Sequence, residues 1–573
     1  MKKKIIPVLI AIVLICVAAL SLAVPKIVDK YSYSKERVDL AEYFGVSGEE
    51  AAILLQDEML EDKALVRNGI VYFSQGTVSN YMEDRFYFNS TEMVVKYTLP
   101  DEVDTVYLDV QPGVIYASTP DGGVISNTDD CGYPLALYEN ETLYLAADLV
   151  DNYCRMSYTL YQEPYRVQVY TADDQITSAV ISKNTAVRKL GGIKSPVLED
   201  VMKSDTVVIL NQMDTWSEVK TKDGVIGYVE TKYLTQIQEV TRQETPDYTE
   251  PVWPQITHEG KIAMAWHQVM NKDANSTLSG MTANAGCLNV ISPTWIQLSA
   301  NDGSFASLSS ADYVEKAHAL GMEVWVLVDD FTYDVDLNEI LSVTETRENL
   351  ASRLVNEVVS VGADGINIDF EHVSSACGSH FAQFLRELSI LTHRAGIVLS
   401  VDNYVPQGGS PQYNRKEQGL VADYVVIMGY DEHWSGCPEA GSVASIGYVE
   451  RGIRDTINTG VPASKIINGV PFYTRVWKTD GAEVTSSALD MQSAQEWIAK
   501  YNVPVEWDEE TCQNYGELKG TDGSTYQVWL EDAQSLQVKF NIMNNYDIAG
   551  VSAWKLGYET ADIWGLVEAY LNS

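Results

Sequence analysis

The feature that most constrains the fold of this chain is a regular alternation of apolar runs and helical patterns after residue 257. The helical patterns are clearest at residues 309–321 and 348–362. Strands that alternate with helices predict a parallel sheet covered by helices, and eight such strands match an α/β fold of the (β/α)8, or TIM, barrel type. An open doubly wound sheet is the alternative, but no glycine-rich phosphate loop follows any run. The expected strands lie within residues 261–266, 287–295, 323–330, 365–371, 396–402, 424–431, 465–473 and 550–556.

The fourth apolar run carries polar side chains at alternate positions. Because side chains alternate along a strand, Asn367, Asp369 and Glu371 share the face that would point into the barrel. Burial and neighbouring like charge raise carboxyl pKa values. Glu371 comes last, at the carboxyl end of the strand, where barrel active sites lie, and a carboxyl with a raised pKa suits a general acid there. The alternative is a half-exposed strand whose polar face meets water.

Further motifs occur in a fixed order along the same region. Residues 364–371 read DGINIDFE, 427–431 read IMGYD, 469–477 read GVPFYTRVW and 550–559 read GVSAWKLGYE. Together they resemble the motifs of glycoside hydrolase family 18, the chitinase-like barrels, over about residues 258 to 570. Asn367 stands where the family motif DGxDxDxE has its middle Asp, and Thr474 replaces the glycine of GxPFYGRxW. The long interval before the eighth strand, with YQVWLEDAQSLQVKFNIM at 526–543, resembles the small α+β insertion of that family between strands seven and eight.

The resemblance implies substrate-assisted, retaining hydrolysis of a glycosidic bond, in which no protein carboxylate attacks the sugar. Glu371 would be the catalytic acid and then the base. Asp369, the second catalytic residue, would hold the N–H of the sugar's 2-acetamido group while the acetamide oxygen closes on the anomeric carbon. Tyr430 would hydrogen-bond the acetamide, and Trp554 would lie under the reacting ring. Asn367 would support Asp369 by hydrogen bonding.

The same motifs imply further contacts with the substrate. Met428, Asp431, Tyr473 and Arg475 are expected to bind it together with Asn367, and no metal or cofactor is needed. Other interpretations stay open at this point. Met428 and Trp554 would also fit plain barrel core, and Asp431 with Arg475 would also fit a structural ion pair.

The chemistry requires a 2-acetamido sugar on the non-reducing side of the cleaved bond, and both peptidoglycan and chitin supply one. Residues 430–453 resemble the peptidoglycan branch of the family, which includes spore-cortex N-acetylglucosaminidases. We therefore expect an N-acetylglucosamine-containing glycan of the cell wall as substrate, with chitin as the alternative. A non-catalytic, sugar-binding wall protein would typically lack the acid, and a structural tether would not need the other motifs.

The N-terminus reads MKKK followed by a long apolar run with no charge. Such a run can cross a hydrocarbon core about 30 Å thick as a helix, and the lysines orient the rest of the chain outside the cytoplasm. Residues 1–24 are therefore expected to be a membrane anchor, or alternatively the cleaved signal of a secreted protein. The net charge of −40 repels phosphate backbones, which argues against a nucleic-acid partner.

Two smaller domains are expected between the anchor and the barrel domain at 257–573. Residues 31–173 have short Tyr-, Val- and Thr-rich runs, which predict a β-rich, stalk-like extracellular domain. Residues 177–235 contain two strand patterns around an Asp-Gly turn and resemble a bacterial SH3-like domain, which would bind wall peptides or act as a spacer. Residues 236–256, with Pro246, Pro251 and Pro254, are expected to be a linker.

Six cysteines follow the apolar N-terminal run, and none of them has the spacing of a metal site. Cys377 and Cys437 follow the fourth and sixth expected strands, so both should lie above the same face of the barrel. We expect a disulfide bond between them.

Overall fold

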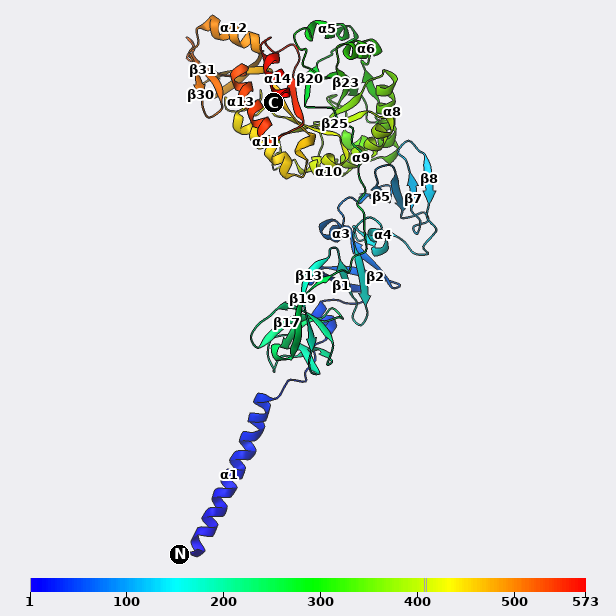
Figure 1. The fold of residues 1–573 in the computed structure, drawn as a ribbon, viewed down its shortest axis with the longest axis vertical. Coiled ribbons are helices and arrows are strands. Elements are labelled where there is room, and N and C mark those ends of the chain that lie inside the picture. The colour runs from blue at the N-terminus through cyan, green and yellow to red at the C-terminus, as the bar shows by residue number, and fades with distance from the viewer. Residues whose placement is uncertain (1, 407, 409) are drawn as a thin grey trace. The chain divides into compact units, whose positions relative to one another are not determined.

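The computed structural model describes residues 2–406, 408 and 410–573 (Figure 1). The chain divides into two compact units. Unit 1 comprises Met1–Phe88, Val106–Val114 and Asp129–Glu250, and unit 2 comprises Asn89–Thr105, Ile115–Thr128 and Pro251–Ser573.

Unit 2 contains a closed barrel of eight parallel strands, as the sequence predicted. β20 pairs with both β21 and β33, which closes the sheet and excludes the open doubly wound alternative. One barrel strand lies in each of the eight apolar runs. The strands are β20 (Ile262–His267), β21 (Val290–Leu298), β23 (Glu323–Asp329), β24 (Gly365–Asp369), β25 (Val398–Tyr404), β26 (Tyr424–Met428), β27 (Ile466–Pro471) and β33 (Gly550–Trp554).

Helices follow these strands around the outside of the barrel (Figure 1). Local sequence sets their ends: the Ser310 hydroxyl caps α6 by accepting the Tyr313 N–H, and Gly396, at a φ of 72°, ends α9. The helices are α5 (Leu278–Met281), α6 (Ala311–Ala319), α7 (Leu337–Leu341), α8 (Thr344–Ser360), α9 (Gly378–Ala395), α10 (Arg415–Val421), α11 (Ile446–Asn458), α13 (Ala533–Tyr546) and α14 (Ile563–Leu571).

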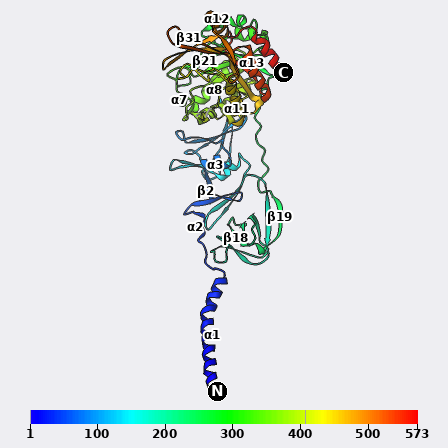
Figure 2. The ribbon, with the colours of Figure 1, turned by 90° about the vertical axis from the view of Figure 1, so that its left-hand side faces the viewer.

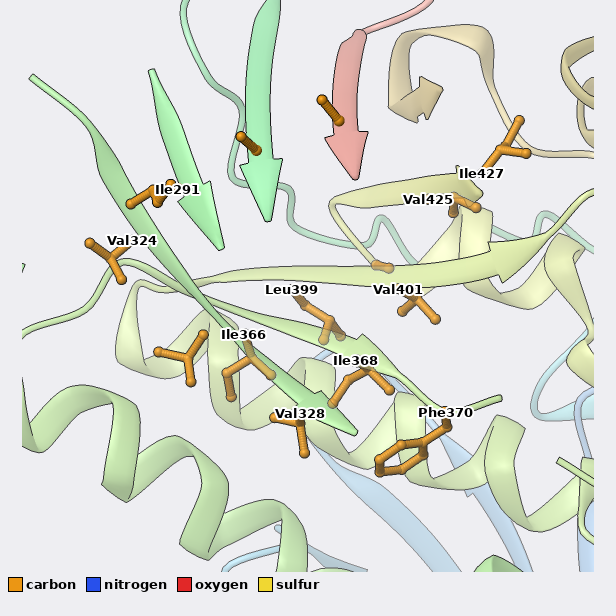
Figure 3. Close-up of a cluster of buried hydrophobic side chains, with 14 of the residues drawn as sticks. Ile291, Val324, Val328, Ile366, Ile368, Phe370, Leu399, Val401, Val425 and Ile427 are labelled. Atoms are coloured by element: carbon orange, nitrogen blue, oxygen red, sulfur yellow. The ribbon is translucent and has the colours of Figure 1, made fainter. Parts of the chain in front are cut away.

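The alternation of β24 separates two environments. Ile366, Ile368 and Phe370 are buried in the core between barrel and helices, together with Leu399 and Val401 of β25 (Figure 3). The residues between them face the barrel interior, whose apolar part includes Trp266, Trp325 and Val426. A single strand therefore supplies the outer core and the polar interior at once.

The interval between β27 and β33 forms the expected α+β insertion. Its five-stranded sheet has the order β29-β28-β32-β31-β30, and β31 packs beside α13 (Figures 1 and 2). The elements are β28 (Tyr473–Asp480), β29 (Glu483–Asp490), α12 (Met491–Tyr501), β30 (Val505–Asp508), β31 (Gln513–Lys519) and β32 (Thr525–Leu530).

Two segments of unit 2, Asn89–Thr105 and Ile115–Thr128, come from the region expected as an N-terminal domain. They supply most of the sheet β4 (Tyr87–Asn89), β5 (Val94–Thr98), β6 (Val103–Tyr107), β7 (Tyr116–Ser118) and β8 (Val124–Asn127), and β5 packs on α9. Lys96 Nζ, almost fully buried, lies 2.6 Å from Glu348 Oε1 and 3.6 Å from Glu387 Oε1. Glu387 is also held by Arg347 at 2.8 and 2.9 Å, so a buried charge cluster joins β5 to α8 and α9. The Gln383 amide donates to Thr98 at 3.0 Å within the same contact.

Unit 1 contains two seven-stranded sheets. The first consists of β1 (Glu50–Leu55), β2 (Glu58–Arg67), β3 (Ile70–Ser74), β9 (Ala136–Glu139), β10 (Thr142–Ala146), β11 (Ser157–Tyr161) and β12 (Arg166–Tyr170). The second consists of β13 (Asp174–Ile181), β14 (Thr185–Arg188), β15 (Val197–Val201), β16 (Thr206–Asn211), β17 (Trp216–Lys220), β18 (Ile226–Glu230) and β19 (Leu234–Arg242). The expected hairpin is β17–β18, whereas β19, which pairs with β13, occupies the first part of the segment expected as a linker. Three short helices, α2 (Leu40–Phe44), α3 (Gln75–Tyr81) and α4 (Ala147–Asp151), complete the unit.

The apolar N-terminal run is helical. Within α1 (Lys2–Tyr31), residues 6–31 are long and apolar enough to cross a membrane, and their most apolar 18-residue stretch has a mean hydropathy of 3.0 and is not buried against the other described residues.

The expected disulfide between Cys377 and Cys437 is wrong. All cysteines are free thiols. Cys377 lies at the start of α9 with its side chain fully buried in the core between barrel and helices. Cys437 lies in the loop after β26, where its sulfur accepts the Trp434 N–H at 3.3 Å. The two cysteines follow β24 and β26, but their sulfur atoms do not form a bond, because the Cys377 side chain points into the core.

Candidate active site

A cavity of about 210 Å³ is lined by residues at the carboxyl ends of the barrel strands. Seven of the nine residues expected to be catalytic or substrate-binding line it: Asp369, Glu371, Met428, Tyr430, Asp431, Tyr473 and Trp554. Asn367 and Arg475 are not among the lining residues. Four lining residues were missed by the sequence analysis: Trp266, Phe331, Asp402 and Tyr404.

Strand register places carboxyl groups side by side at this end of the barrel. Asp329 on β23 pairs with Asp369 on β24. Ile368 on β24 pairs with Val401 on β25, which sets the next residue, Asp402, beside Asp369. Three neighbouring strands therefore bring carboxyl groups together at this end of the barrel, and two of these groups, Asp369 and Asp402, line the cavity.

Glu371 is held from three directions. Tyr404 Oη donates to Glu371 Oε2. Asp330 accepts the backbone N–H groups of Glu371 and His372, both at 3.0 Å, and Tyr413 Oη donates to the Glu371 carbonyl at 3.0 Å. Burial raises the pKa of Glu371, and Asp330 adds to that rise, while the hydrogen bond from Tyr404 opposes it. A positioned carboxyl with a raised pKa is what proton donation to a leaving group requires.

Asp369 is almost completely buried. Burial raises its pKa well above the ordinary value, and the charges of Asp402 and Glu371 raise it further. Its Oδ1 atom is buried and has no hydrogen-bond partner among the described residues. The atom is therefore free to accept a hydrogen bond from a group that enters the cavity.

Asn367 lies beneath the cavity and makes four hydrogen bonds. Its Oδ1 accepts from Trp266 Nε1 at 3.0 Å and from Ser292 Oγ at 3.1 Å. Its Nδ2 donates to Ser400 Oγ at 3.1 Å and to Asp402 Oδ1 at 2.7 Å. These bonds use both amide hydrogens, so Asn367 supports Asp402 rather than Asp369, which differs from the sequence expectation.

Asp431 and Arg475 have separate partners. Tyr473 Oη donates to Asp431 Oδ1 at 2.5 Å, and Asp431 has a φ of 57°, in the left-handed region. Arg475 donates to Ser486 Oγ at 3.1 Å, on the neighbouring strand of the insertion. Asp431 therefore belongs to the cavity wall, and Arg475 lies in the sheet behind it.

Aromatic rings form the apolar part of the cavity. The Trp266 ring lies 6.0 Å from the Trp554 ring and 6.3 Å, edge-on, from the Tyr430 ring. Burial raises the pKa of Tyr430 well above its ordinary value, so its hydroxyl stays a hydrogen-bond donor. Aromatic faces next to carboxyl groups can hold a sugar ring, whose C–H face is apolar and whose edge is polar.

Two of the four lining residues that the sequence analysis missed follow a pattern that is visible in the sequence. Ser400 and Asp402 alternate along the fifth apolar run in the same way as the polar residues of the fourth, and Tyr404 continues the alternation just beyond that run. Extending the period of two through this segment would have found Asp402 and Tyr404. Trp266, at the end of an unbroken apolar run, had no such signal. Within the described residues, no group of three His, Cys, Asp or Glu side chains has the arrangement of a metal site.

Comparison with known proteins adds to this geometry. Residues 275–559 match the sequence model of the family Glycosyl hydrolases family 18. Two relatives come from Bacillus subtilis (strain 168). The "Putative sporulation-specific glycosylase YdhD" is 34% identical over 38% of this chain and 53% of its own length, and the "Cortical fragment-lytic enzyme" is 30% identical over 39% and 54%.

A solved structure shares the fold. The "C-terminal domain of putative chitinase from Desulfitobacterium hafniense DCB-2" superposes with a TM-score of 0.51 at 20% identity, over 55% of this chain and 100% of that one. The match to the two Bacillus relatives spans about half of their lengths.

Proposed function

We propose that the protein is a glycosidase that cleaves β-1,4-linked glycans containing N-acetylglucosamine, because residues 275–559 match the sequence model of glycosyl hydrolases family 18. The observation that carries the proposal is Glu371, a carboxyl with a raised pKa at the cavity, held by Tyr404 and Asp330. Asp369 lies in the same cavity with an unpartnered oxygen. Glu371 would donate the proton, and Asp369 would accept a hydrogen bond from the substrate's acetamide N–H.

In the first step, Glu371 gives its proton to the glycosidic oxygen as the bond to the anomeric carbon breaks. The acetamide oxygen of the same sugar forms a new bond to that carbon, and Asp369 accepts the acetamide N–H, whose positive charge grows. In the second step, Glu371 takes a proton from water. The water oxygen bonds to the anomeric carbon and the acetamide oxygen leaves, so the configuration is retained.

The aromatic residues position the sugar for these steps. Trp554 and Trp266 offer apolar faces beside the carboxyl groups, and Tyr430 offers a hydroxyl that remains protonated. Met428, Asp431 and Tyr473 complete the wall around the ring. Asn367 acts indirectly, through Asp402, and Arg475 would act through the insertion.

Peptidoglycan is the substrate we propose, since it carries N-acetylglucosamine in β-1,4 linkage. The name of the relative that is a cortical fragment-lytic enzyme supports a wall or cortex glycan. The sequence at 430–453 supports the same choice through its resemblance to the peptidoglycan branch of the family.

The remaining parts of the chain would place the enzyme at the wall. We propose that α1 anchors the protein in the membrane with the barrel on the outer side, because the lysines precede the apolar run. The domain of strands β13–β19 would act as an SH3-like module that binds wall peptides.

The experiment is digestion of purified peptidoglycan and of chitin by the full-length protein, with mass analysis of the products. Peptidoglycan fragments that end in a reducing N-acetylglucosamine are expected from the native protein. The Glu371→Gln variant, which keeps the shape of the side chain, should release almost none. If the native protein releases chitin oligosaccharides but no peptidoglycan fragments, peptidoglycan is rejected as the substrate. If the native protein and Glu371→Gln release equal amounts of product, Glu371 is rejected as the acid.

A further inference from the structure

Asp402 is a buried carboxyl group of the cavity to which the catalytic steps above assign no role. It is 2% exposed and stands beside Asp369 through the pairing of β24 with β25. Adjacent strands lie about 4.8 Å apart, and both side chains line the same cavity. Two such neighbouring carboxyl groups repel one another when both are ionised, and the charge of Asp402 raises the pKa of Asp369.

The hydrogen bonds of Asp402 leave one of its oxygens available. Asn367 Nδ2 donates to Asp402 Oδ1 at 2.7 Å, which fixes the orientation of the carboxyl group. Asp402 Oδ2 and Asp369 Oδ1 are both buried, and neither has a partner among the described residues. A proton on one of these oxygens would satisfy both, because the protonated oxygen donates and the other accepts.

We propose that Asp402 is the proton-sharing partner of Asp369: the pair holds one proton, which resides on Asp402 Oδ2 when Asp369 ionises to receive the acetamide. Asn367, an amide, cannot hold that proton and instead orients the residue that does. Asp402 does not touch the reacting atoms in this scheme, so it is a positioning residue. The role during turnover rests on the proposed function, whereas the shared proton does not.

The charges around the pair support this assignment. Burial raises the pKa of Asp402, the N–H groups of Asn367 and Trp266 oppose the rise and the charge of Glu371 adds to it, so that the resulting pKa is about 8. The other titratable groups that face the pair are Asp329 and Asp330 of the β23 end and Tyr430 after β26. Among the described residues that line the cavity, none has a basic side chain to offset a second negative charge.

The test is a pH titration of the full-length, substrate-free protein with carbon-13-labelled aspartate carboxyl groups, read by NMR. In the native protein the pair should lose its protons in two coupled steps. In Asp402→Asn the new amide oxygen keeps the bond from Asn367, and the new amide nitrogen replaces Oδ2. Asp369 should then titrate in a single step at lower pH, because the neighbouring like charge is gone. The Asp369→Asn variant assigns the signals.

Ser400→Ala is the matched control. It removes one acceptor of the Asn367 amide, at 3.1 Å, but keeps both carboxyl groups. The two coupled steps should persist in this variant. If Ser400→Ala changes the Asp369 titration as much as Asp402→Asn does, or if Asp402→Asn leaves that titration unchanged, the shared proton is rejected.

Kinetics test the role in turnover. The kcat of Asp402→Asn should stay within about 10-fold of the native value, because the amide imitates the protonated carboxyl group. The kcat of Asp402→Leu should fall by about 100-fold, with little change in KM. Equal losses of kcat in both variants would overturn the positioning role.

The double variant Asp402→Asn with Asn367→Asp moves the second carboxyl group from position 402 to position 367. Its carboxyl pair should again titrate in two coupled steps, and a single step in the double variant would contradict the shared proton. A native protein that cleaves no glycan would reject the proposed function and leave the titration result standing.

Discussion

Asp330 Oδ1 accepts the backbone N–H of Glu371 at 3.0 Å, and Asp330 Oδ2 accepts that of His372 at the same distance. A carboxylate just after β23 therefore fixes the peptide that carries the expected acid just after β24. Such charge-assisted bonds to backbone N–H groups are stronger than neutral ones. The position of Glu371 thus depends on two strands rather than on one.

Replacing Asp330 by Asn should displace Glu371, because the amide nitrogen cannot accept a hydrogen bond. We expect kcat to fall by about 10- to 100-fold and the free energy of unfolding to fall by about 1 kcal/mol, since the hydrogen bond that is lost is only partly buried. Steady-state kinetics and thermal unfolding measure the two effects. Asp334→Asn, at an exposed position of the same loop, should change neither.

Glu371→Gln removes the proton that the leaving group needs. Turnover on a natural glycan should fall by at least about 100-fold, while the fold and substrate binding are retained. Product release followed by mass analysis measures the loss. Glu439→Gln removes an exposed carboxylate from the loop after β26 and should be close to native; near-native turnover of Glu371→Gln would show that another group is the acid.

Tyr404→Phe tests the hydrogen bond to Glu371. This bond stabilises the ionised carboxylate and so opposes the raised pKa of Glu371. Without it the pKa of Glu371 rises further, so the acid stays protonated to higher pH. The alkaline limb of the kcat/KM profile should move to higher pH, with about a 10-fold loss at the optimum. Tyr333→Phe, at a fully exposed aromatic of the loop after β23, should leave the profile in place, and a downward shift in Tyr404→Phe would contradict the assignment.

Asp369→Ala separates substrate-assisted catalysis from attack by a protein carboxylate. A thiazoline analogue of the cyclised intermediate should inhibit the native protein, since catalysts bind such states more tightly than substrate. Inhibition should weaken in Asp369→Ala, because the ring nitrogen loses its acceptor. Substrates with a free 2-amino group at the reacting sugar should not be cleaved. Trapping of a glycosyl ester on any Asp or Glu by a 2-fluoro sugar would exclude the substrate-assisted route.

Lys96→Met should destabilise unit 2. The change leaves Glu348 and the fully buried Glu387 with less positive charge around them. Breaking a buried pair from one side costs about 3 kcal/mol in unfolding free energy. Lys316→Met, which breaks an exposed pair with Asp312, should cost less than about 1 kcal/mol. Adding Glu348→Gln to Lys96→Met should recover part of the loss, and equal effects of the two lysine changes would refute a buried cluster.

The sequence predicted the barrel because its signals are local. Apolar runs mark strands, and the period of two along β24 separates Ile368, in the outer core, from Asp369, in the cavity. The same period in β25 would have revealed Asp402, but that strand had no motif to draw attention to it. The contact of Lys96 with Glu348 joins residues that lie 252 positions apart. Such pairs leave no periodic trace, so neither this contact nor the burial of Cys377 could be foreseen.

The docking of β5 on α8 and α9 limits how this chain could exchange its parts during evolution. A gene fusion that replaced everything after residue 257 would keep Lys96 and Thr98 but lose their partners Glu348, Glu387 and Gln383. A successful recombinant would need an acidic pair at the same places on its own helices, or an apolar residue at position 96. The β5 segment and the barrel should therefore be inherited together, even though the rest of the chain between them folds as a separate unit.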